Sequence, residues 1–141
     1  MIFELNDDGQ SYTVVGIDGV DAQIVVPATY NDKPVVAIGE RAFYDCRYTT
    51  YVHLPDSITS IGDRAFTGCD KLKSIIIPQE VTTIGVHTFE SCRALESVII
   101  PNDITSIGDY AFFACIKLTT ITFAGNQVKS IGDSAFAYCD S

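Results

Sequence analysis

The chain has 141 residues, and its 47% hydrophobic content with 11% aromatics is enough for a buried core and excludes an intrinsically disordered chain. Its formal charge of −9, without any basic cluster, argues against binding to phosphate backbones or anionic lipid headgroups, so we expect no nucleic-acid partner. No apolar run reaches the ~20 residues of a membrane-spanning helix, and the first residues lack the pattern of a signal peptide, so we expect no membrane insertion.

Residues 1–20 do not carry the repeat that fills the rest of the chain. Turn-forming residues 6–9 separate two β-prone stretches, 3–5 and 12–15. A stacked repeat must cover the apolar end of its first coil. We therefore interpret residues 1–20 as an N-terminal β-hairpin cap.

Residues 21–141 consist of about five copies of one unit. Each copy ends in a cysteine at the same place, and successive cysteines are 23, 23, 23 and 24 residues apart: Cys46, Cys69, Cys92, Cys115 and Cys139. A fixed period of this length predicts a solenoid of stacked coils rather than a closed globule. We therefore treat residues 1–141 as a single repeat domain.

Each unit begins with a predicted β-strand. Apolar residues occupy positions one, four and six of segments such as 72–77 and 95–100, and proline follows directly in four of the five units. The pleat of a strand then turns positions four and six inward and positions three and five outward. Proline cannot continue a hydrogen-bond ladder, so it marks the corner where the strand ends.

The second half of the unit has the pattern Ile-Gly-x-x-Ala-Phe-x-x-Cys, with threonine at the alanine position in one copy. The glycine permits a sharp bend or a close approach of neighbouring coils. An acidic residue after most of these glycines has the character of a helix cap, so we predict a short helical or 3-10 turn here. A calcium ladder along Glu40, Asp63, Asp109 and Asp133 is the alternative, but Val86 interrupts the row and no oxygen-rich calcium loop is present.

Two columns of side chains follow from the period. We predict a buried aromatic spine of one phenylalanine per coil: Phe43, Phe66, Phe89, Phe112 and Phe136. The cysteines are interpreted as small side chains packed in the core, with disulfides and metal binding as alternatives, although no Cys-x-x-Cys pair occurs.

Departures from the period predict surface loops at 28–34 and 124–127. The chain stops just past the fifth cysteine, without a further strand or a polar cap. We expect a fragment of a longer solenoid, or alternatively end-to-end self-association through the uncapped C-terminal coil.

Units such as 104–123, ITSIGDYAFFACIKLTTITF, closely resemble the BspA-type leucine-rich repeats, and the resemblance covers about residues 21–141. It implies an α/β solenoid: a right-handed coil with one parallel β-sheet on its concave face and short turns on its convex face. It also implies a large surface or secreted protein, mostly of bacteria or protists, with a role in adhesion. The usual asparagine of leucine-rich repeats is replaced in three of four units, and we hypothesise that Ser60, Thr83, Ser106 and Ser130 satisfy part of the backbone instead.

The outward positions of the predicted strands form an uncharged row on a strongly acidic chain, which is typical of a protein-contact patch. The candidate partner-binding residues are Val25, Tyr51, His53, Ser74, Ile76, Ser97, Ile99, Thr120 and Thr122. The alternative is that β-branched residues stand there only for strand propensity.

No catalytic constellation is evident. The two histidines, His53 and His87, are predicted on opposite sides of the coil, and no nucleophile turn or phosphate-binding glycine pattern occurs. We therefore expect no enzyme, no metal and no cofactor. The predicted function is a protein-binding or adhesion module for a protein or glycoprotein ligand, with a passive spacer and an intracellular scaffold as alternatives.

Overall fold

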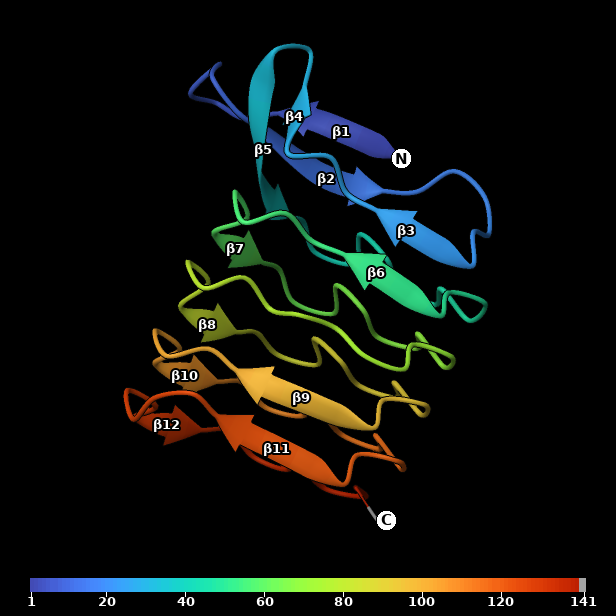
Figure 1. The fold of residues 1–141 in the computed structure, drawn as a ribbon, viewed down its shortest axis with the longest axis vertical. Coiled ribbons are helices and arrows are strands. Elements are labelled where there is room, and N and C mark those ends of the chain that lie inside the picture. Colours follow the sequence, from blue (N-terminus) through green and yellow to red (C-terminus); the bar gives the residue numbers. More distant parts are fainter. Residues whose placement is uncertain (140–141) are drawn as a thin grey trace.

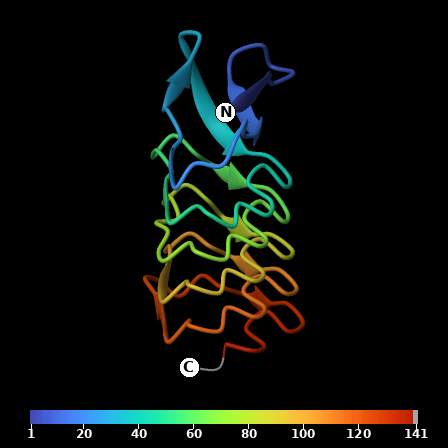
Figure 2. The ribbon, with the colours of Figure 1, turned by 90° about the vertical axis from the view of Figure 1, so that its right-hand side faces the viewer.

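The computed structural model describes residues 1–139, which contain strands and turns but no helix. The chain winds into stacked coils in which equivalent segments of successive repeats lie side by side (Figure 1). Figure 2 shows the same stack from the side, with the hairpins at its N-terminal end. The class is therefore a β-solenoid rather than the predicted α/β solenoid, while the right-handed, concave shape stays a prediction.

The predicted N-terminal hairpin is present. Strand β1 (Ile2–Leu5) pairs antiparallel with β2 (Tyr12–Gly16), and β2 pairs in parallel with β5 (Lys33–Ile38). Val14 of β2 is fully buried, so the hairpin contributes to the core as well as extending the stack.

Residues 28–34 form a second hairpin, so the prediction of a plain loop was wrong. Strand β4 (Thr29–Tyr30) pairs antiparallel with β5, and the turn between them places Asn31 and Asp32 at φ angles of 47° and 60°. Asparagine and aspartate tolerate the left-handed region, which a type I′ hairpin turn requires at both central positions. Tyr30 stacks on Phe3 with ring centroids 4.1 Å apart, which ties this hairpin to the first one.

The strands that open the repeat units line up on one side of the stack. They are β3 (Gln23–Val25), β6 (Tyr51–His53), β9 (Ser97–Ile100) and β11 (Thr120–Phe123). Pairs β3/β6 and β9/β11 are parallel and in register, with Gln23 beside Tyr51 and Ser97 beside Thr120.

The predicted single sheet is interrupted, because residues 72–78 between β6 and β9 form no strand. Backbone hydrogen bonds still join this segment to both neighbours at Lys73: its N–H donates to Thr50 (3.4 Å) and its carbonyl accepts from Glu96 (3.2 Å). The predicted alternation also persists, since Ile75 and Ile77 are 5% and 3% exposed and Ile76 is 82% exposed. Core packing thus keeps Ile75 and Ile77 oriented inward where the hydrogen-bond ladder is interrupted.

A second row of short strands was not predicted. It consists of β7 (Ser60–Ile61), β8 (Thr83–Ile84), β10 (Ser106–Ile107) and β12 (Ser130–Ile131). Strands β8, β10 and β12 pair in parallel, and β7 pairs in parallel with β5. The sequence showed only an apolar pair here, because two-residue strands are too short to display an alternation.

The segment from each glycine to the cysteine forms consecutive turns, so the predicted helical turns are wrong. In residues 62–69, the N–H groups of Ala65 and Thr67 close turns onto Gly62 and Arg64, whereas that of Phe66 donates to Thr88 of the next coil. Every second N–H is therefore used between coils and is not available for a helix. The φ angle of 57° at Arg64 also lies outside helical conformation.

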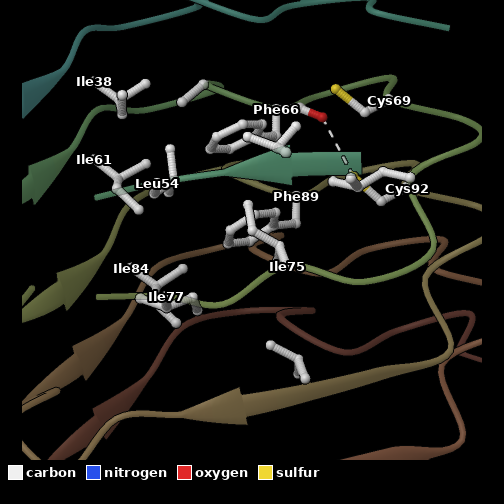
Figure 3. Close-up of a cluster of buried hydrophobic side chains, with 14 of the residues drawn as sticks. Ile38, Leu54, Ile61, Phe66, Cys69, Ile75, Ile77, Ile84, Phe89 and Cys92 are labelled. Carbon is white, nitrogen blue, oxygen red and sulfur yellow. Dashed lines mark hydrogen bonds between the residues drawn. The ribbon is translucent and has the colours of Figure 1, made fainter. Parts of the chain in front are cut away.

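The predicted buried aromatic spine is confirmed for Phe43, Phe66, Phe89 and Phe112, whereas Phe136 of the last coil is only partly buried. Successive rings of the phenylalanine column stack with centroids 5.2 or 5.3 Å apart and interplanar angles of at most 20°. Figure 3 shows Phe66 and Phe89 one below the other, with Ile61 and Ile84 to one side of the rings and Ile75 next to Phe89.

The predicted burial of the cysteine column is confirmed for its three central members, whereas Cys46 and Cys139 are only partly buried. The column also has a further role. Cys69, Cys92 and Cys115 are fully buried, unpaired thiols. Each donates a hydrogen bond of 3.1 to 3.3 Å to the carbonyl of the phenylalanine in the preceding coil. Figure 3 shows the bond from Cys92 to Phe66. Cys139 makes the equivalent bond to Phe112 at 3.2 Å. A thiol is small enough for the core and still supplies a weak donor.

The aspartates cap the next coil, not a helix. The Oδ1 atom of Asp63 accepts from the N–H of Val86, and that of Asp109 accepts from the N–H of Asp133, both at 2.8 Å. The glycines just before the two donors allow this close approach, since a Cβ atom on Gly85 would collide with Oδ1 of Asp63 and one on Gly132 with Oδ1 of Asp109.

The hypothesis for the missing asparagine ladder names the wrong hydroxyls. No side-chain hydrogen bond from Ser60, Thr83, Ser106 or Ser130 occurs within residues 1–139. Instead Ser57 donates to the carbonyl of Val35 at 2.7 Å, and Thr59 and Thr105 donate to the preceding coil at 3.2 Å.

Candidate functional site

The nine candidate partner-binding residues lie on one side of the solenoid, which we call the strand face. They come from β3, β6, residues 72–78, β9 and β11, and all nine are exposed: Val25, Tyr51, His53, Ser74, Ile76, Ser97, Ile99, Thr120 and Thr122. Their neighbours Ile24, Val52, Ile75 and Val98 are buried, so the strand pleat separates core from surface as predicted.

The strand face is apolar at its centre. Ile76 is 82% exposed, and Val25 and Ile99 are each 60% exposed, so no other part of residues 1–139 covers these apolar side chains. None of the nine residues is aspartate, glutamate, lysine or arginine. An uncharged row of this kind differs from the rest of a chain with a net charge of −9.

Two shallow hollows flank Ile76. One, of about 60 Å³, lies toward Tyr51 and His53, and the other, of about 150 Å³, lies toward Ile99 and is closed by Gln79 and Pro101. They occur beside residues 72–78, where the strand ladder is interrupted. These hollows could not be predicted from the residue pattern, because they depend on the spacing of neighbouring coils.

The histidines occupy different sides of the coil. His53 is exposed on β6, whereas His87 lies in the column of turns, with Nδ1 2.8 Å from Oε2 of Glu90 and its ring stacked on Tyr110 at 4.9 Å. No group of three metal-ligating side chains occurs within residues 1–139.

A larger hollow of about 360 Å³ lies at the edge of the turns, and sequence reasoning missed it. Its lining includes Tyr44, Gly68 and Ser91 of three successive coils. The charged groups at its border are paired, Arg47 with Asp45 at 2.6 Å and Arg93 with Asp70 at 3.8 Å. It therefore presents neither a nucleophile with a base nor a set of metal ligands.

The buried thiols are held in their neutral form. Burial raises the pKa of Cys115 to about 12, and the nearby Cys139 adds to the effect. The adjacent Cys69 thiol and burial raise the pKa of Cys46 well above its ordinary range. A neutral, enclosed thiol is a poor nucleophile, so these groups are structural.

In-register parallel coils with buried columns of leucine, isoleucine, phenylalanine and cysteine define a leucine-rich repeat solenoid. Residues 27–141 match the family model described as "BspA type Leucine rich repeat region (6 copies)", and the chain belongs to this family. Leucine-rich repeats generally serve as protein-interaction modules. No curated protein gives a significant match to the chain.

Solved leucine-rich repeat structures resemble the chain over nearly its whole length. The T. pallidum leucine rich repeat protein is 33% identical, with a TM-score of 0.92 over 98% of this chain. This chain spans only 64% of that protein. A leucine-rich repeat protein from Bacteroides capillosus is 30% identical, with a TM-score of 0.76 over 87% of this chain and 93% of its own.

A third similar structure is a leucine rich cell surface protein from Faecalibacterium prausnitzii. It is 25% identical, with a TM-score of 0.65 over 97% of this chain and 50% of its own.

Within residues 1–139 of the present chain, no helix is long and apolar enough to cross a membrane.

Proposed function

We propose that the chain is a non-enzymatic binding module that engages a protein or glycoprotein through the strand face. The observation that carries the proposal is the exposed row of Val25, Ile76 and Ile99 on an otherwise acidic surface. Exposing aliphatic side chains to water is unfavourable by about 25 cal/mol per Å² of apolar area, so covering them favours association.

The composition of the strand face fits a contact surface better than it fits the alternative, in which these residues serve only strand propensity. The apolar centre is bordered by the hydroxyls of Ser74, Ser97 and Thr120, which offer donors and acceptors to a partner. The hollows on both sides of Ile76 add relief into which partner side chains fit. Strand propensity alone explains the β-branched residues of the strand face, but it does not explain the hollows beside Ile76, the most exposed of them.

A cell-surface or secreted location, with a role in adhesion, is part of the proposal. It is supported by the family resemblance and by the similar F. prausnitzii structure, which is described as a cell surface protein. A passive spacer and an intracellular scaffold are the alternative functions. The location of the full-length protein in fractionated cells separates the scaffold from the other two.

The strand face is tested by a double variant, Ile76→Asp with Ile99→Asp. Purified extracellular proteins and glycoproteins are screened against the wild-type chain by surface plasmon resonance, and each binder is retested on the variant. We expect loss of binding with an unchanged circular-dichroism melt, because both side chains are outside the core. Ile116→Asp is the matched control, since Ile116 is also an exposed isoleucine but is not part of the strand face. A partner that binds wild type and the double variant equally would rule out this face.

End-to-end self-association remains a second proposal. It is favoured by Phe123 and Ile131 of the last coil, which are 44% and 53% exposed. Sedimentation equilibrium of wild type and of Ile131→Asp tests it, with a concentration-dependent mass expected for wild type alone.

A further inference from the structure

We infer that the partner of the strand face carries lysine or arginine side chains next to an aliphatic patch, and that these cations lie over one particular edge of the face. This inference rests on the proposed function and adds the chemistry and orientation of the partner. It follows from the uneven distribution of charge on the two edges that border the strands.

The edge at which the strands end is acidic, and we call it the corner edge. It consists of Asp56, Glu80 and Asp103, which follow the corner prolines of three successive coils and are all exposed. Within residues 1–139, no lysine, arginine or histidine nitrogen lies within 4.0 Å of these three carboxylates.

The corner edge borders the apolar centre directly. Gln79, next to Glu80, lines the same hollow as Ile76 and Ile99. Asp56 occupies the position equivalent to Gln79 in the preceding coil, and Asn102 the equivalent position in the following one. A chain that fills this hollow with an aliphatic side chain therefore brings its neighbouring residues over the corner edge.

The opposite edge, where the strands begin, is balanced in charge. It carries five of the nine cations of the chain: Arg47, Lys71, Lys73, Arg93 and Lys117. Two of these are paired within the chain, Arg47 with Asp45 and Arg93 with Asp70. Lys73 lies next to Glu96, whose N–H donates to the Lys73 carbonyl at 3.2 Å. The opposite edge therefore carries both signs of charge, whereas every described cation stays more than 4.0 Å from the three carboxylates of the corner edge.

Charge complementarity selects a basic polypeptide over a second copy of this chain. Two copies with a net charge of −9 each repel during approach, and a partner rich in phosphate or sulfate meets the same repulsion. Lysine or arginine placed over the corner edge gains attraction without a competing cation from this chain. Exposed charges of this kind mainly raise the association rate and make it sensitive to salt.

The experiment uses two short probe peptides, one of alternating valine and lysine and one of alternating valine and glutamate, with binding followed by fluorescence anisotropy. We expect the valine-lysine peptide to bind the wild-type chain, to weaken as salt is added, and to bind more tightly than the valine-glutamate peptide. The corner variant, Asp56→Asn with Glu80→Gln and Asp103→Asn, is expected to bind it about ten-fold more weakly, as the loss of three exposed ion pairs implies.

A matched control removes the same charge elsewhere. Glu4→Gln with Asp7→Asn and Asp32→Asn neutralises three exposed carboxylates of the N-terminal hairpins and is expected to keep the affinity within about two-fold. Equal weakening in both triple variants would overturn the inference, because total charge rather than the corner edge would then decide binding.

The face variant Ile76→Asp with Ile99→Asp separates the inference from the proposed function. If a protein partner is lost with the face variant but retained by the corner variant, the inference fails and the proposed function stands. If neither variant affects the partner, both fail. A dimer of wild type that the face variant dissolves would also overturn the inference, because a second copy would then be the occupant.

Discussion

Thr88 is a buried side chain whose hydroxyl has no hydrogen-bond partner, and the other coils have alanine at its position. An unsatisfied buried hydroxyl costs roughly 1–3 kcal/mol of desolvation. Replacing it by a methyl group of similar size removes that cost. We therefore expect Thr88→Val to raise the free energy of unfolding by about 1 kcal/mol, as measured by urea denaturation.

Thr67 is the matched control for Thr88. It is also buried, but its Oγ1 donates to the carbonyl of His87 at 2.5 Å. Thr67→Val is expected to lower the free energy of unfolding by about 1 kcal/mol, since it breaks this bond. A change of the same sign in both variants would show that hydrogen bonding does not determine the effect.

The thiol column makes a second prediction at the level of single residues. Because burial raises the pKa of Cys115 to about 12, its neutral form is favoured in the folded state. The stability linked to this group is fully present below the unfolded pKa of ~8.5 and is lost as pH rises from there toward 12. We expect the native protein to resist a disulfide-exchange reagent at pH 8 and its melting temperature to fall above pH 9.

Reagent accessibility supplies the control for the thiols. Cys46 is only half-buried, so it is expected to react before Cys69, Cys92 and Cys115, which react after unfolding in guanidinium. Rapid reaction of these three in the native protein would contradict the buried column.

Among the structural elements, the turns behind each glycine depend on left-handed residues. Ala114 has a φ angle of 56°, and the residue at its position in an earlier coil is Gly68, with φ 74°. A residue with a Cβ atom pays about 1–2 kcal/mol in this region, whereas glycine costs roughly 0.5–1 kcal/mol more to order. Ala114→Gly is therefore expected to stabilise the protein by about 0.5–1 kcal/mol in urea denaturation.

Two further variants test whether relief of the left-handed backbone causes the stabilisation expected for Ala114→Gly. Gly68→Ala is expected to destabilise, because it places a Cβ atom on a left-handed residue. Ala111→Gly is also expected to destabilise, since Ala111 is fully buried and has no positive φ. Stabilisation by both glycine substitutions would indicate general flexibility rather than relief of backbone strain.

Strands were easier to predict than turns, and the physical reason differs between the two. The alternation of Ile75, Ile76 and Ile77 follows directly from the pleat, so their burial was predicted correctly even where the ladder lapses. The turn segments were predicted as helical because the acidic residue after most of the glycines has the character of a helix cap. That prediction failed because the next coil competes for the same N–H groups, which is a long-range effect that no local pattern contains.

The strand face likewise has features that could be predicted from the sequence and features that could not. The outward direction of Tyr51, Ile76 and Ile99 was available from the period and the pleat. The hollows beside Ile76 and the unpaired state of Asp56, Glu80 and Asp103 were not, because they depend on distances between coils and on which arginines find partners elsewhere.

At the scale of the whole molecule, every stabilising column joins a coil only to its two neighbours. The ring of Phe89 stacks on those of Phe66 and Phe112, and the thiols and aspartates also reach one coil away. Stability in such a stack approximates a sum over coils and their interfaces. We expect Phe89→Ala to lower the free energy of unfolding by about 3–5 kcal/mol, because it leaves a cavity in the spine.

Where in the chain Phe89→Ala lowers the local stability distinguishes a stack of coils from a closed core. In Phe89→Ala, amide hydrogen exchange is expected to accelerate most in the coils of Phe66, Phe89 and Phe112, which share the cavity. The amides of the β1/β2 hairpin are expected to keep more of their protection, because the ring of Phe3 in this hairpin packs on Tyr12 and Tyr30 and not on the spine. A uniform acceleration over all amides would contradict this, since it requires the hairpin and the coils to open together as one cooperative unit.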